Sequence, residues 1–320
     1  MEIKVSIVIP VYKVEKYIER CLRSVFNQTY ANIECIIVND CTPDNSFIIA
    51  KELVESYQGS IDFQFVEHKR NKGLSEARNT GIKKTTGHYY FFLDSDDAIP
   101  PTSIEKLVET ASLNDQPEIV MGVTKGVDAK GAMIEVSKAQ EQSFLENSEV
   151  FQGYLNNLWY VIACNKLVRK DIFTEHKTFF LPGITHEDVM WSFEISTYVN
   201  KIILCPFVTY HYYIGDTDSI SRSVWNTKRV NDSITIIERK AVYLESVSDR
   251  KGLARHIKNE SVNIVYSLFR NGFSNDEIKK FMKRIVRLNS KKSIREVRTD
   301  VPIYRRVVYY LYHLLCCEFV

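Results

Sequence analysis

Two aspartates, Asp94 and Asp96, form the pattern in this sequence that most directly indicates chemistry. They follow the apolar run at residues 89–93, and in an extended stretch residues i and i+2 point to the same side. Carboxylates placed in this way repel each other unless a cation lies between them. Oxygen ligands suit Mg²⁺ or Mn²⁺, and such a cation can neutralise a diphosphate leaving group. The pattern predicts a divalent-cation site, and its alternative is a turn or a helix cap.

The segments around this pair alternate between expected strands and expected helices. Apolar runs predict strands at residues 6–12, 33–38, 61–66 and 89–93. Helical spacing predicts helices at 17–26, 45–57, 75–84 (with Ser75 as N-cap) and 101–113. Such alternation implies a largely parallel sheet with helices on both faces. Ligands bind at the C-terminal ends of the strands of such sheets, so Tyr12, Asp40 and the aspartate pair should gather at one edge.

The second half of the chain has weaker patterns until about residue 225. A strand is expected at residues 118–123, a hairpin and loop at 124–146, a mixture of helix and turn at 147–167, a helix at 187–198 and a strand at 201–209. Four amphipathic helices are then expected at 226–247, 251–271, 275–289 and 301–316. We therefore expect an α/β domain over residues 1–222 and a helical region over residues 223–320.

Asp40 and Arg78 are two further candidates on the α/β domain. Asp40 ends a strand, where its carboxylate can accept a hydrogen bond from a base or a ribose hydroxyl, or can make an Asx-turn. Arg78 lies on an expected helix after Gly73, and it can reach a phosphate, lock a catalytic aspartate or simply face solvent. The sequence has no dinucleotide-binding glycine pattern and no Walker-type loop.

Two more clusters carry groups that could take part in a reaction. Glu187 and Asp188 begin an expected helix, where either can serve as a general base, or can simply complement the helix dipole. Residues 210–213 and 218–222 offer His, Ser and Arg donors for phosphates or metal, with His211 as the candidate metal ligand. The alternative for this second cluster is an ordinary surface loop.

Together these segments resemble the family 2 glycosyltransferases, which have the GT-A fold. Residues 5–12, 37–46, 71–79 and 92–97 are similar to successive blocks of that family in order and spacing. The resemblance weakens after about residue 120, although residues 164–169 and 186–189 still look like blocks of bacterial members. The sequence has Cys41-Thr42-Pro43 where the family often has Gly-Ser, and Asn39 where Asp is frequent.

The resemblance implies a GT-A-type nucleotide-binding domain with a mostly parallel central sheet, followed by a C-terminal helical extension. It implies an inverting hexosyl- or N-acetylhexosaminyl-transferase, with a nucleotide-diphosphate sugar (usually a UDP-sugar) as donor. The acceptor would be a hydroxyl of a saccharide or lipid-linked saccharide in bacterial cell-surface polysaccharide synthesis, and the cofactor Mn²⁺ or Mg²⁺. The implied site residues are Pro10, Val11, Tyr12, Asp40, Arg78, Asp94 and Ser95 for the nucleotide, Asp96 and His211 for the metal, and Asp188 for the base, with Glu187 as its alternative.

Composition narrows the class of protein further. The chain has 42 basic and 40 acidic residues, a net charge of +2, so no global field favours nucleic acid. Its seven cysteines contain no Cys-x-x-Cys pair, which fits a reducing compartment. No apolar stretch has the length of a membrane span or the flanks of a signal peptide. These features predict a cytoplasmic protein.

The C-terminal region is basic and aromatic. Eleven Lys and Arg residues lie between residues 279 and 306, and an aromatic-aliphatic run follows at 304–315. A basic segment beside an amphipathic aromatic helix can lie on an anionic membrane surface, here the inner face of the cell membrane. The alternative is a helical appendage whose apolar stripe packs on the rest of the protein.

Two other functions compete with the transferase. A metal-dependent phosphohydrolase or nucleotidyltransferase could use the same Asp-x-Asp pair, but the turn after the first strand has neither a nucleophilic Asp nor a Gly-rich basic loop. A nucleotide-sugar-binding protein without catalysis would need no base. The presence of Glu187 and Asp188 favours an enzyme.

Overall fold

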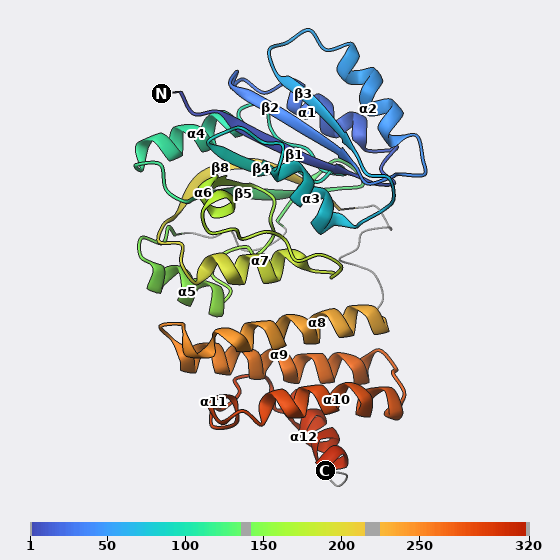
Figure 1. Cartoon of the computed structure of the whole chain (residues 1–320), viewed down its shortest axis with the longest axis vertical. Helices are drawn as coiled ribbons and strands as arrows, with labels where there is room; N and C mark the ends of the chain where they lie inside the picture. The colour runs from blue at the N-terminus through green and yellow to red at the C-terminus, as the bar shows by residue number, and fades with distance from the viewer. Residues whose placement is uncertain (1, 136–141, 215–224, 318–320) are drawn as a thin grey trace. The chain divides into compact units, whose positions relative to one another are not determined.

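The computed structural model describes residues 2–135, 142–214 and 225–317, and it divides into two compact units (Figure 1). The first unit comprises Met1–Gly183 and Glu194–Thr217. The second comprises Ile184–Phe193 and Asp218–Val320. The domain boundary expected between residues 222 and 223 lies outside the described residues. Each unit is considered by itself below.

The first unit is built on one eight-stranded sheet with the order β3-β2-β1-β4-β7-β5-β6, and β8 pairs with β5 beside this path. The strands are β1 (Val5–Val11), β2 (Ile33–Asn39), β3 (Asp62–Glu67), β4 (Tyr89–Phe92), β5 (Ile119–Asp128), β6 (Met133–Ile134), β7 (Lys166–Arg169) and β8 (Ile202–Ile214). Strands β1, β2, β3 and β4 are parallel, as is the β5–β8 pair. Strand β7 runs antiparallel to β4 and β5. The sheet is therefore mostly parallel, as expected.

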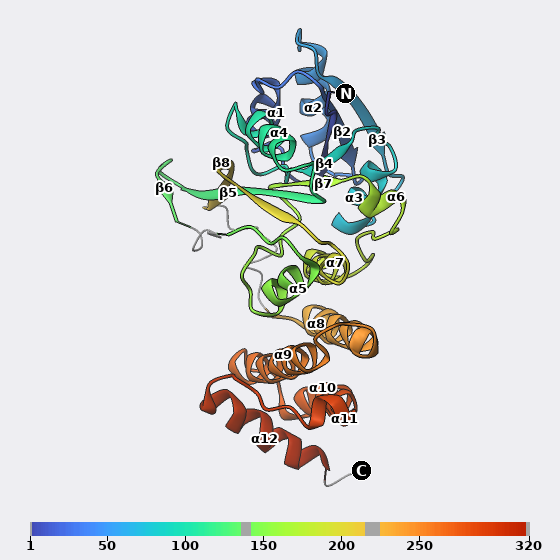
Figure 2. The ribbon, with the colours of Figure 1, turned by 90° about the vertical axis from the view of Figure 1, so that its left-hand side faces the viewer.

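Helices cover both faces of this sheet. Seen along the sheet in Figure 2, α1 and α4 lie on one side and α3 and α6 on the other. Every residue of β1, β2 and β4 is buried, which is why these strands are mostly apolar in sequence. The helices are α1 (Ile18–Phe26), α2 (Ser46–Glu55), α3 (Leu74–Ile82), α4 (Ser103–Leu113), α5 (Asn147–Leu155) and α6 (Asp171–Thr174).

Two local details concern the N-cap of α3 and the position of Pro10 in β1. Helix α3 begins at Leu74 with Gly73 as its N-cap, whose φ of 88° favours glycine, so Ser75 is not the cap. Pro10 lies inside β1, but the β1–β4 ladder ends at Val8, so the missing N–H of Pro10 interrupts no pairing with β4.

The second unit is helical, as predicted. It contains α8 (Thr227–Lys240), a 3₁₀ turn (Ala241–Glu245), α9 (Arg250–Arg270), α10 (Asn275–Asn289), α11 (Lys292–Arg295) and α12 (Ile303–Cys317). Helix α7 (Glu187–Ser196) begins in this unit. Side-chain caps start its longer helices: Asn226 for α8, Asp249 for α9, and Ser274 in a capping box with Glu277 for α10.

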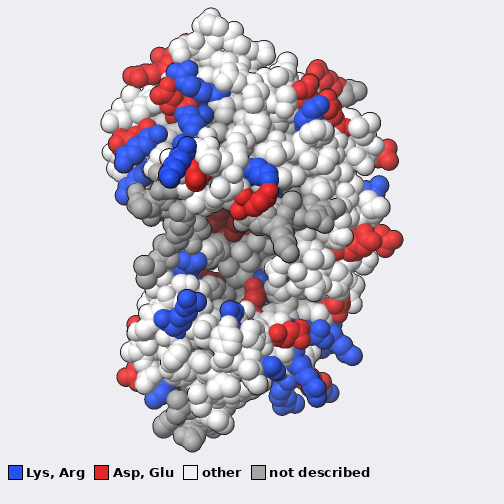
Figure 3. Space-filling view, turned by 180° about the vertical axis from the view of Figure 1, so that it is seen from behind, with Lys and Arg blue, Asp and Glu red and all other residues white. Residues whose placement is uncertain are grey.

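Helix α12 has one buried and one exposed face. On the buried side, the Tyr309 hydroxyl accepts a hydrogen bond from Asn289 at 2.9 Å. Ile303, Val307, Leu311 and Leu314 are all more than half exposed. Residues 275–317 carry eleven basic and four acidic side chains, and Figure 3 shows a group of Lys and Arg on the helical unit. Among the described residues, no helix is long and apolar enough to cross a membrane.

Candidate functional site

The aspartates after β4 form an acidic turn, residues 94–97, at the carboxyl edge of the sheet. Asp94 and Asp96 are half-exposed, whereas Ser95 and Asp97 are buried. Arg20 of α1 donates a hydrogen bond to the main-chain carbonyl of Asp96. The Arg20 guanidinium also lies 3.5 Å from the centre of the Tyr213 ring of β8. Helix α1 therefore contacts this turn directly through Arg20, and β8 packs against the same arginine.

Arg78 orients the first aspartate of the turn. Its guanidinium lies 2.7 Å from Oδ1 of Asp94, and the Arg78 side chain is only 3% exposed. The Sγ atom of buried Cys164 lies 3.8 Å from the same guanidinium nitrogen. Of the alternatives that the sequence left open for Arg78, a solvated helix face is wrong. A charge-assisted hydrogen bond of this kind directs the Asp94 carboxylate.

Asp97 joins the acidic turn to β8. Its carboxyl group lies 2.8 Å from the Tyr210 hydroxyl and accepts a hydrogen bond from the Tyr213 N–H at 2.9 Å. Burial raises the pKa of Asp97 well above its ordinary value, and the neighbouring Asp96 and Asp94 raise it further. Arg20, Asp97 and Tyr210 were not among the predicted site residues, although Asp97 directly follows the predicted aspartate pair and Tyr210 lies in the cluster predicted at residues 210–213.

The donor atoms near the turn fit a divalent cation. The half-exposed carboxylates of Asp94 and Asp96 supply the oxygen ligands that Mg²⁺ and Mn²⁺ prefer. His211 lies in β8 opposite Ala98, two residues beyond Asp96. Burial lowers the pKa of His211, which favours the neutral imidazole that binds metals. Among the residues described, no three His, Cys, Asp or Glu side chains form a metal-binding group by themselves.

Asp40 is buried and organises the loop after β3. Its two carboxylate oxygens accept hydrogen bonds from the backbone N–H groups of Lys72 and Gly73, both at 2.8 Å. Its Oδ1 atom also lies 2.6 Å from Nδ1 of His68. The turn after β2 is made by Asn39, whose side chain accepts from the Thr42 N–H at 2.9 Å, and not by Asp40.

The expected nucleotide residues at the end of β1 lie beside Asp40. The N–H of Asp40 donates to the carbonyl of Val11 at 3.0 Å. Pro10 and Val11 are buried in the strand, and Tyr12 is 41% exposed just beyond it. The structure therefore brings the first expected block and Asp40 together at one edge of the sheet.

The candidate bases belong to the second unit, at the start of α7. Glu187 is buried and Asp188 is half-exposed, with its Oδ1 accepting from the Val189 N–H at 2.9 Å. The preceding His186 adopts a left-handed backbone with φ of 60°. Burial and the nearby Arg229 lower the pKa of His186, which favours its neutral form. Of the two acids, Asp188 is the more accessible to a substrate.

Comparisons with known proteins identify the family and the fold of this chain. The model of glycosyl transferase family 2 matches residues 6–177. The chain is similar to YibD of Escherichia coli, an uncharacterized glycosyltransferase, with 29% identity over 68% of this chain and 63% of YibD. The matched part is thus less than two thirds of the length of that relative.

A further relative and a solved structure extend the likeness to nearly the whole chain. TarP of Staphylococcus aureus, a poly(ribitol-phosphate) beta-N-acetylglucosaminyltransferase, is 25% identical over 94% of this chain and 91% of TarP. The crystal structure of S. aureus TarS residues 1–349 in complex with UDP-GlcNAc covers 98% of this chain, over 90% of that chain, with a TM-score of 0.72 and 16% identity. Because the family model spans more than half of the sequence, this protein belongs to glycosyl transferase family 2, and its fold is the GT-A fold.

Proposed function

We propose that this protein is an inverting glycosyltransferase that moves a sugar from a UDP-sugar to a hydroxyl of a saccharide or lipid-linked saccharide acceptor in bacterial cell-surface polysaccharide synthesis. One observation carries the proposal. The acidic turn leaves Asp96 half-exposed at the carboxyl edge of the sheet, while Arg78 holds Asp94 at 2.7 Å. Ligands of open α/β sheets bind at this edge.

The donor side of the proposal uses the residues gathered at that edge. Pro10, Val11 and Tyr12 would border the base, with Asp40 behind them. Arg78, Asp94 and Ser95 would complete the nucleotide site near the ribose and the phosphates. We propose an N-acetylhexosaminyl donor, UDP-GlcNAc, as the first to test, because it is the sugar nucleotide bound to TarS and TarP is named for transferring N-acetylglucosamine.

Asp96 and His211 would hold Mn²⁺ or Mg²⁺ in this protein. When bound, the cation would supply positive charge to the departing diphosphate. The chain's own contribution is to direct the carboxylates: the Arg78 guanidinium orients Asp94, and Arg20 with Tyr210 holds the turn in place. A turn oriented before the substrate arrives loses less entropy on binding.

Asp188 is our proposed general base, with Glu187 as the alternative. The base would take the proton of the acceptor hydroxyl as that oxygen attacks the anomeric carbon. The half-exposed position of Asp188 supports this choice, because buried Glu187 is less accessible to an acceptor. Attack from the face opposite the leaving diphosphate inverts the anomeric configuration.

The test is release of nucleoside diphosphate by the purified full chain from a panel of uridine-, guanosine- and thymidine-diphosphate sugars. It would be run with Mn²⁺, with Mg²⁺ and with a chelator, in the presence and absence of saccharide acceptors. We expect metal-dependent release of UDP. Asp188→Asn should lower the rate by about 10²–10⁴-fold with little change in UDP affinity, and Glu187→Gln should have the smaller effect.

Other outcomes would favour the competing functions. Binding of a UDP-sugar with no turnover on any acceptor of the panel would favour a nucleotide-sugar-binding protein. Absence of binding to every sugar nucleotide would reject the transferase, and phosphate release from simple phosphate esters would then favour a phosphohydrolase.

We also propose that the protein works in the cytoplasm and contacts the inner face of the membrane through its C-terminal region. The exposed apolar side chains of α12 and the excess of basic over acidic residues at 275–317 support this contact. A lipid-linked acceptor would be presented at that surface. Flotation of the full chain with anionic liposomes is the direct check, and loss of flotation is expected for Val307→Glu combined with Leu311→Glu.

A further inference from the structure

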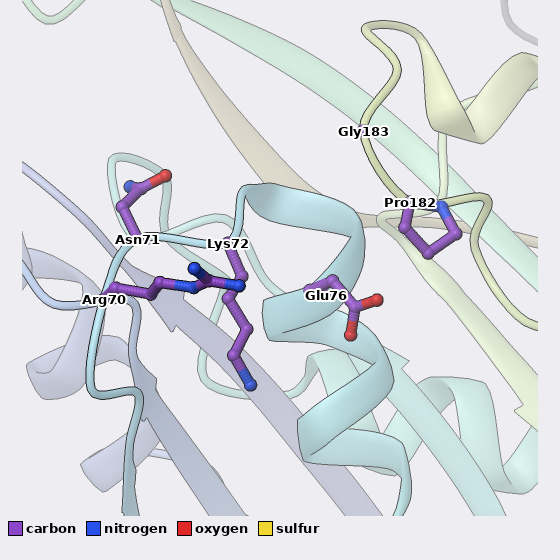
Figure 4. A pocket seen from close by; sticks show the side chains of 6 residues that line it. All are labelled: Arg70, Asn71, Lys72, Glu76, Pro182 and Gly183. Carbon is purple, nitrogen blue, oxygen red and sulfur yellow. The ribbon is translucent and has the colours of Figure 1, made fainter.

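A short loop, residues 183–186, leads to the two candidate bases at the start of α7. Its first residue, Gly183, lines the cleft beside α3 on the nucleotide side of the first unit (Figure 4). The rest of the loop belongs to the second unit. Its last residue, His186, has a left-handed backbone with φ of 60°. Such a conformation costs free energy for any residue other than glycine, so it persists only where contacts on both sides fix the chain.

The contact before His186 is made by Asp232 of α8. Oδ2 of Asp232 accepts a hydrogen bond from the Thr185 N–H at 2.8 Å and another from the Thr185 hydroxyl at 3.0 Å. Both residues belong to the second unit, and they are 47 positions apart in the sequence. Hydrogen bonds to a carboxylate are stronger than those between neutral groups. One oxygen atom therefore fixes both the main chain and the side chain of Thr185.

The contact after His186 is the first turn of α7. The Val189 N–H donates to the carbonyl of His186 at 3.1 Å and to Oδ1 of Asp188 at 2.9 Å. Because the carbonyl of His186 takes part in this turn, the backbone of His186 sets the direction in which Glu187 and Asp188 leave the loop. The orientation of the Asp188 carboxylate thus depends on where Thr185 is held, three positions earlier.

The place of Asp232 within α8 is explained by this contact. Asp232 is 8% exposed and lies on the same buried side of the helix as Val230 and Ile234. Aspartate is a weak helix former, and a buried carboxylate costs free energy unless it has partners. Lys228 lies 2.6 Å from the same oxygen, but its side chain is 60% exposed, and such a pair contributes little to stability. The buried partner of Asp232 is Thr185.

Helix α8 also contacts the far end of this segment of the second unit, residues 184–193. The Phe193 ring packs edge-on against the Tyr243 ring in the 3₁₀ turn that follows α8, with 5.2 Å between the ring centres. The ammonium group of Lys240, at the end of α8, lies 5.9 Å from the centre of the Phe193 ring. Asp232 and Lys240 are separated by about 12 Å along the helix. The segment that carries the candidate bases is therefore held at both ends by the helical unit.

We propose that Asp232 is a positioning residue for the general base: by holding Thr185 it fixes the backbone of His186 and so directs the Asp188 carboxylate towards the acceptor hydroxyl. This proposal rests on the proposed transferase function for the role of Asp188. The contact between Asp232 and Thr185 needs no catalysis. Its effect on the loop can therefore be measured separately from the reaction.

The experiment has two readouts on the purified full chain. Hydrogen exchange followed by mass spectrometry reports on the peptide at residues 184–190, with a peptide from α9 as internal reference. Steady-state kinetics give kcat and the KM for the sugar nucleotide, with the donor and acceptor that show turnover in the panel above. The variants are Asp232→Ala, Asp232→Asn and, as the matched control, Asp276→Ala, since Asp276 is an exposed aspartate of the same unit. Thermal unfolding checks that each protein is folded.

We expect Asp232→Ala to speed exchange at residues 184–190 by about tenfold or more, because two hydrogen bonds to a carboxylate are lost. Its kcat should fall by about 10–100-fold through misplacement of the base, with the KM for the sugar nucleotide unchanged. Asp232→Asn keeps an acceptor oxygen for Thr185, so it should restore both the exchange protection and kcat to within about fivefold of wild type. Asp276→Ala should change neither quantity by more than about twofold.

Several results would overturn the proposal. One is unchanged exchange at residues 184–190 in Asp232→Ala, and another is faster exchange with full kcat. Equal losses in the Ala and Asn variants would mean that the charge beside Lys228 matters and the contact with Thr185 does not. If Asp232→Ala does not fold, Thr185→Val tests the same contact by removing only the hydroxyl, and unchanged exchange and kcat in that variant would overturn the proposal. Absence of turnover by the wild-type protein would instead reject the transferase function itself, and this role of Asp232 with it.

Discussion

The two ends of the central sheet both carry carboxyl groups, but the surroundings shift the pKa values of these groups in opposite directions. At the amino end, Glu34 of β2 is 1% exposed and is surrounded by donors. It accepts hydrogen bonds from Ser6 at 2.5 Å and from the N–H and hydroxyl of Thr86, and Lys4 lies at 2.7 Å. Burial by itself would raise the pKa of Glu34, but these partners outweigh it and lower the pKa to about 2.

At the carboxyl end, three acids lie within four residues, Asp94 to Asp97. Asp97 has the Tyr210 hydroxyl and the Tyr213 N–H as partners, and its pKa is raised by burial and by its acidic neighbours. Arg78 binds Asp94. The acidic neighbours therefore act on Asp97 in the opposite sense to the donors around Glu34. The comparison suggests that the amino end is built for stability and that the carboxyl end is built to receive a positively charged ligand.

The largest effect that separates the two ends is expected for Asp96→Ala. The transfer rate should fall by about 10²–10³-fold, because a half-exposed carboxylate that would hold the cation is removed. The free energy of unfolding should change by no more than about 1 kcal/mol, since Asp96 is half-exposed. UDP release and urea denaturation measure the two quantities. A variant that loses stability but keeps its rate per folded molecule would show that Asp96 is structural.

Glu34→Gln should give the converse result at the amino end. Removing a buried, fully hydrogen-bonded charge beside Lys4 should reduce the free energy of unfolding by about 2–4 kcal/mol, while the transfer rate per folded molecule stays unchanged. Because the folded pKa of about 2 lies below the ordinary value, the stabilisation from Glu34 is complete above the ordinary pKa. It is lost as pH falls from about 4.5 towards 2.

Urea denaturation at neutral pH and at pH values on either side of this window measures the Glu34 contribution. The wild-type protein should lose stability on acidification more steeply than the variant. Glu109→Gln, a change at an exposed residue of α4, is the control and should alter stability by less than about 0.5 kcal/mol. If Glu34→Gln abolished activity in a fully folded protein, the assignment of separate roles to the two ends would be wrong.

The sequence predicted the parallel part of the sheet well because burial on both faces leaves a strong local signal. Strands β1, β2 and β4 are mostly apolar, with Ser6 and Glu34 as buried polar exceptions, and the aspartates directly after β4 have a characteristic spacing. The rule that ligands bind at the carboxyl ends of strands then placed Asp40 and Asp94 at one edge. The long helices α8, α9, α10 and α12 were predictable for a similar reason, since each has an apolar pattern over several turns, whereas the four-residue α11 was not predicted.

The interactions that support the site were not predictable, because they join residues distant in the sequence. Tyr210 and Asp97 are 113 positions apart, and Asn79 and Phe180 are 101 apart. Strand β7 was missed because it is only four residues long and begins and ends with basic residues. No local pattern distinguishes Arg20, which contacts the acidic turn, from Arg23, the other basic residue of α1. Such pairings follow from the order of the strands, and the sequence pattern does not contain that order.

The smallest expected effects come from removing one hydroxyl group at each end, and they test the comparison most closely. Ser6→Ala removes a donor to Glu34, and Tyr210→Phe removes the hydroxyl beside Asp97. Each change should reduce the free energy of unfolding by about 1 kcal/mol, the usual net value of one hydrogen bond.

The two hydroxyl variants should differ in activity. The Tyr210 hydroxyl also accepts from the N–H of Asp94, so its loss loosens the acidic turn on two sides. We expect Tyr210→Phe to lower kcat several-fold and to raise the Mn²⁺ concentration needed for half-maximal rate, whereas Ser6→Ala should change neither. Equal activity of the two variants would mean that the turn keeps its geometry without the Tyr210 hydroxyl. The Arg78 guanidinium at Asp94 and the Tyr213 N–H at Asp97 would then be sufficient to orient these carboxylates.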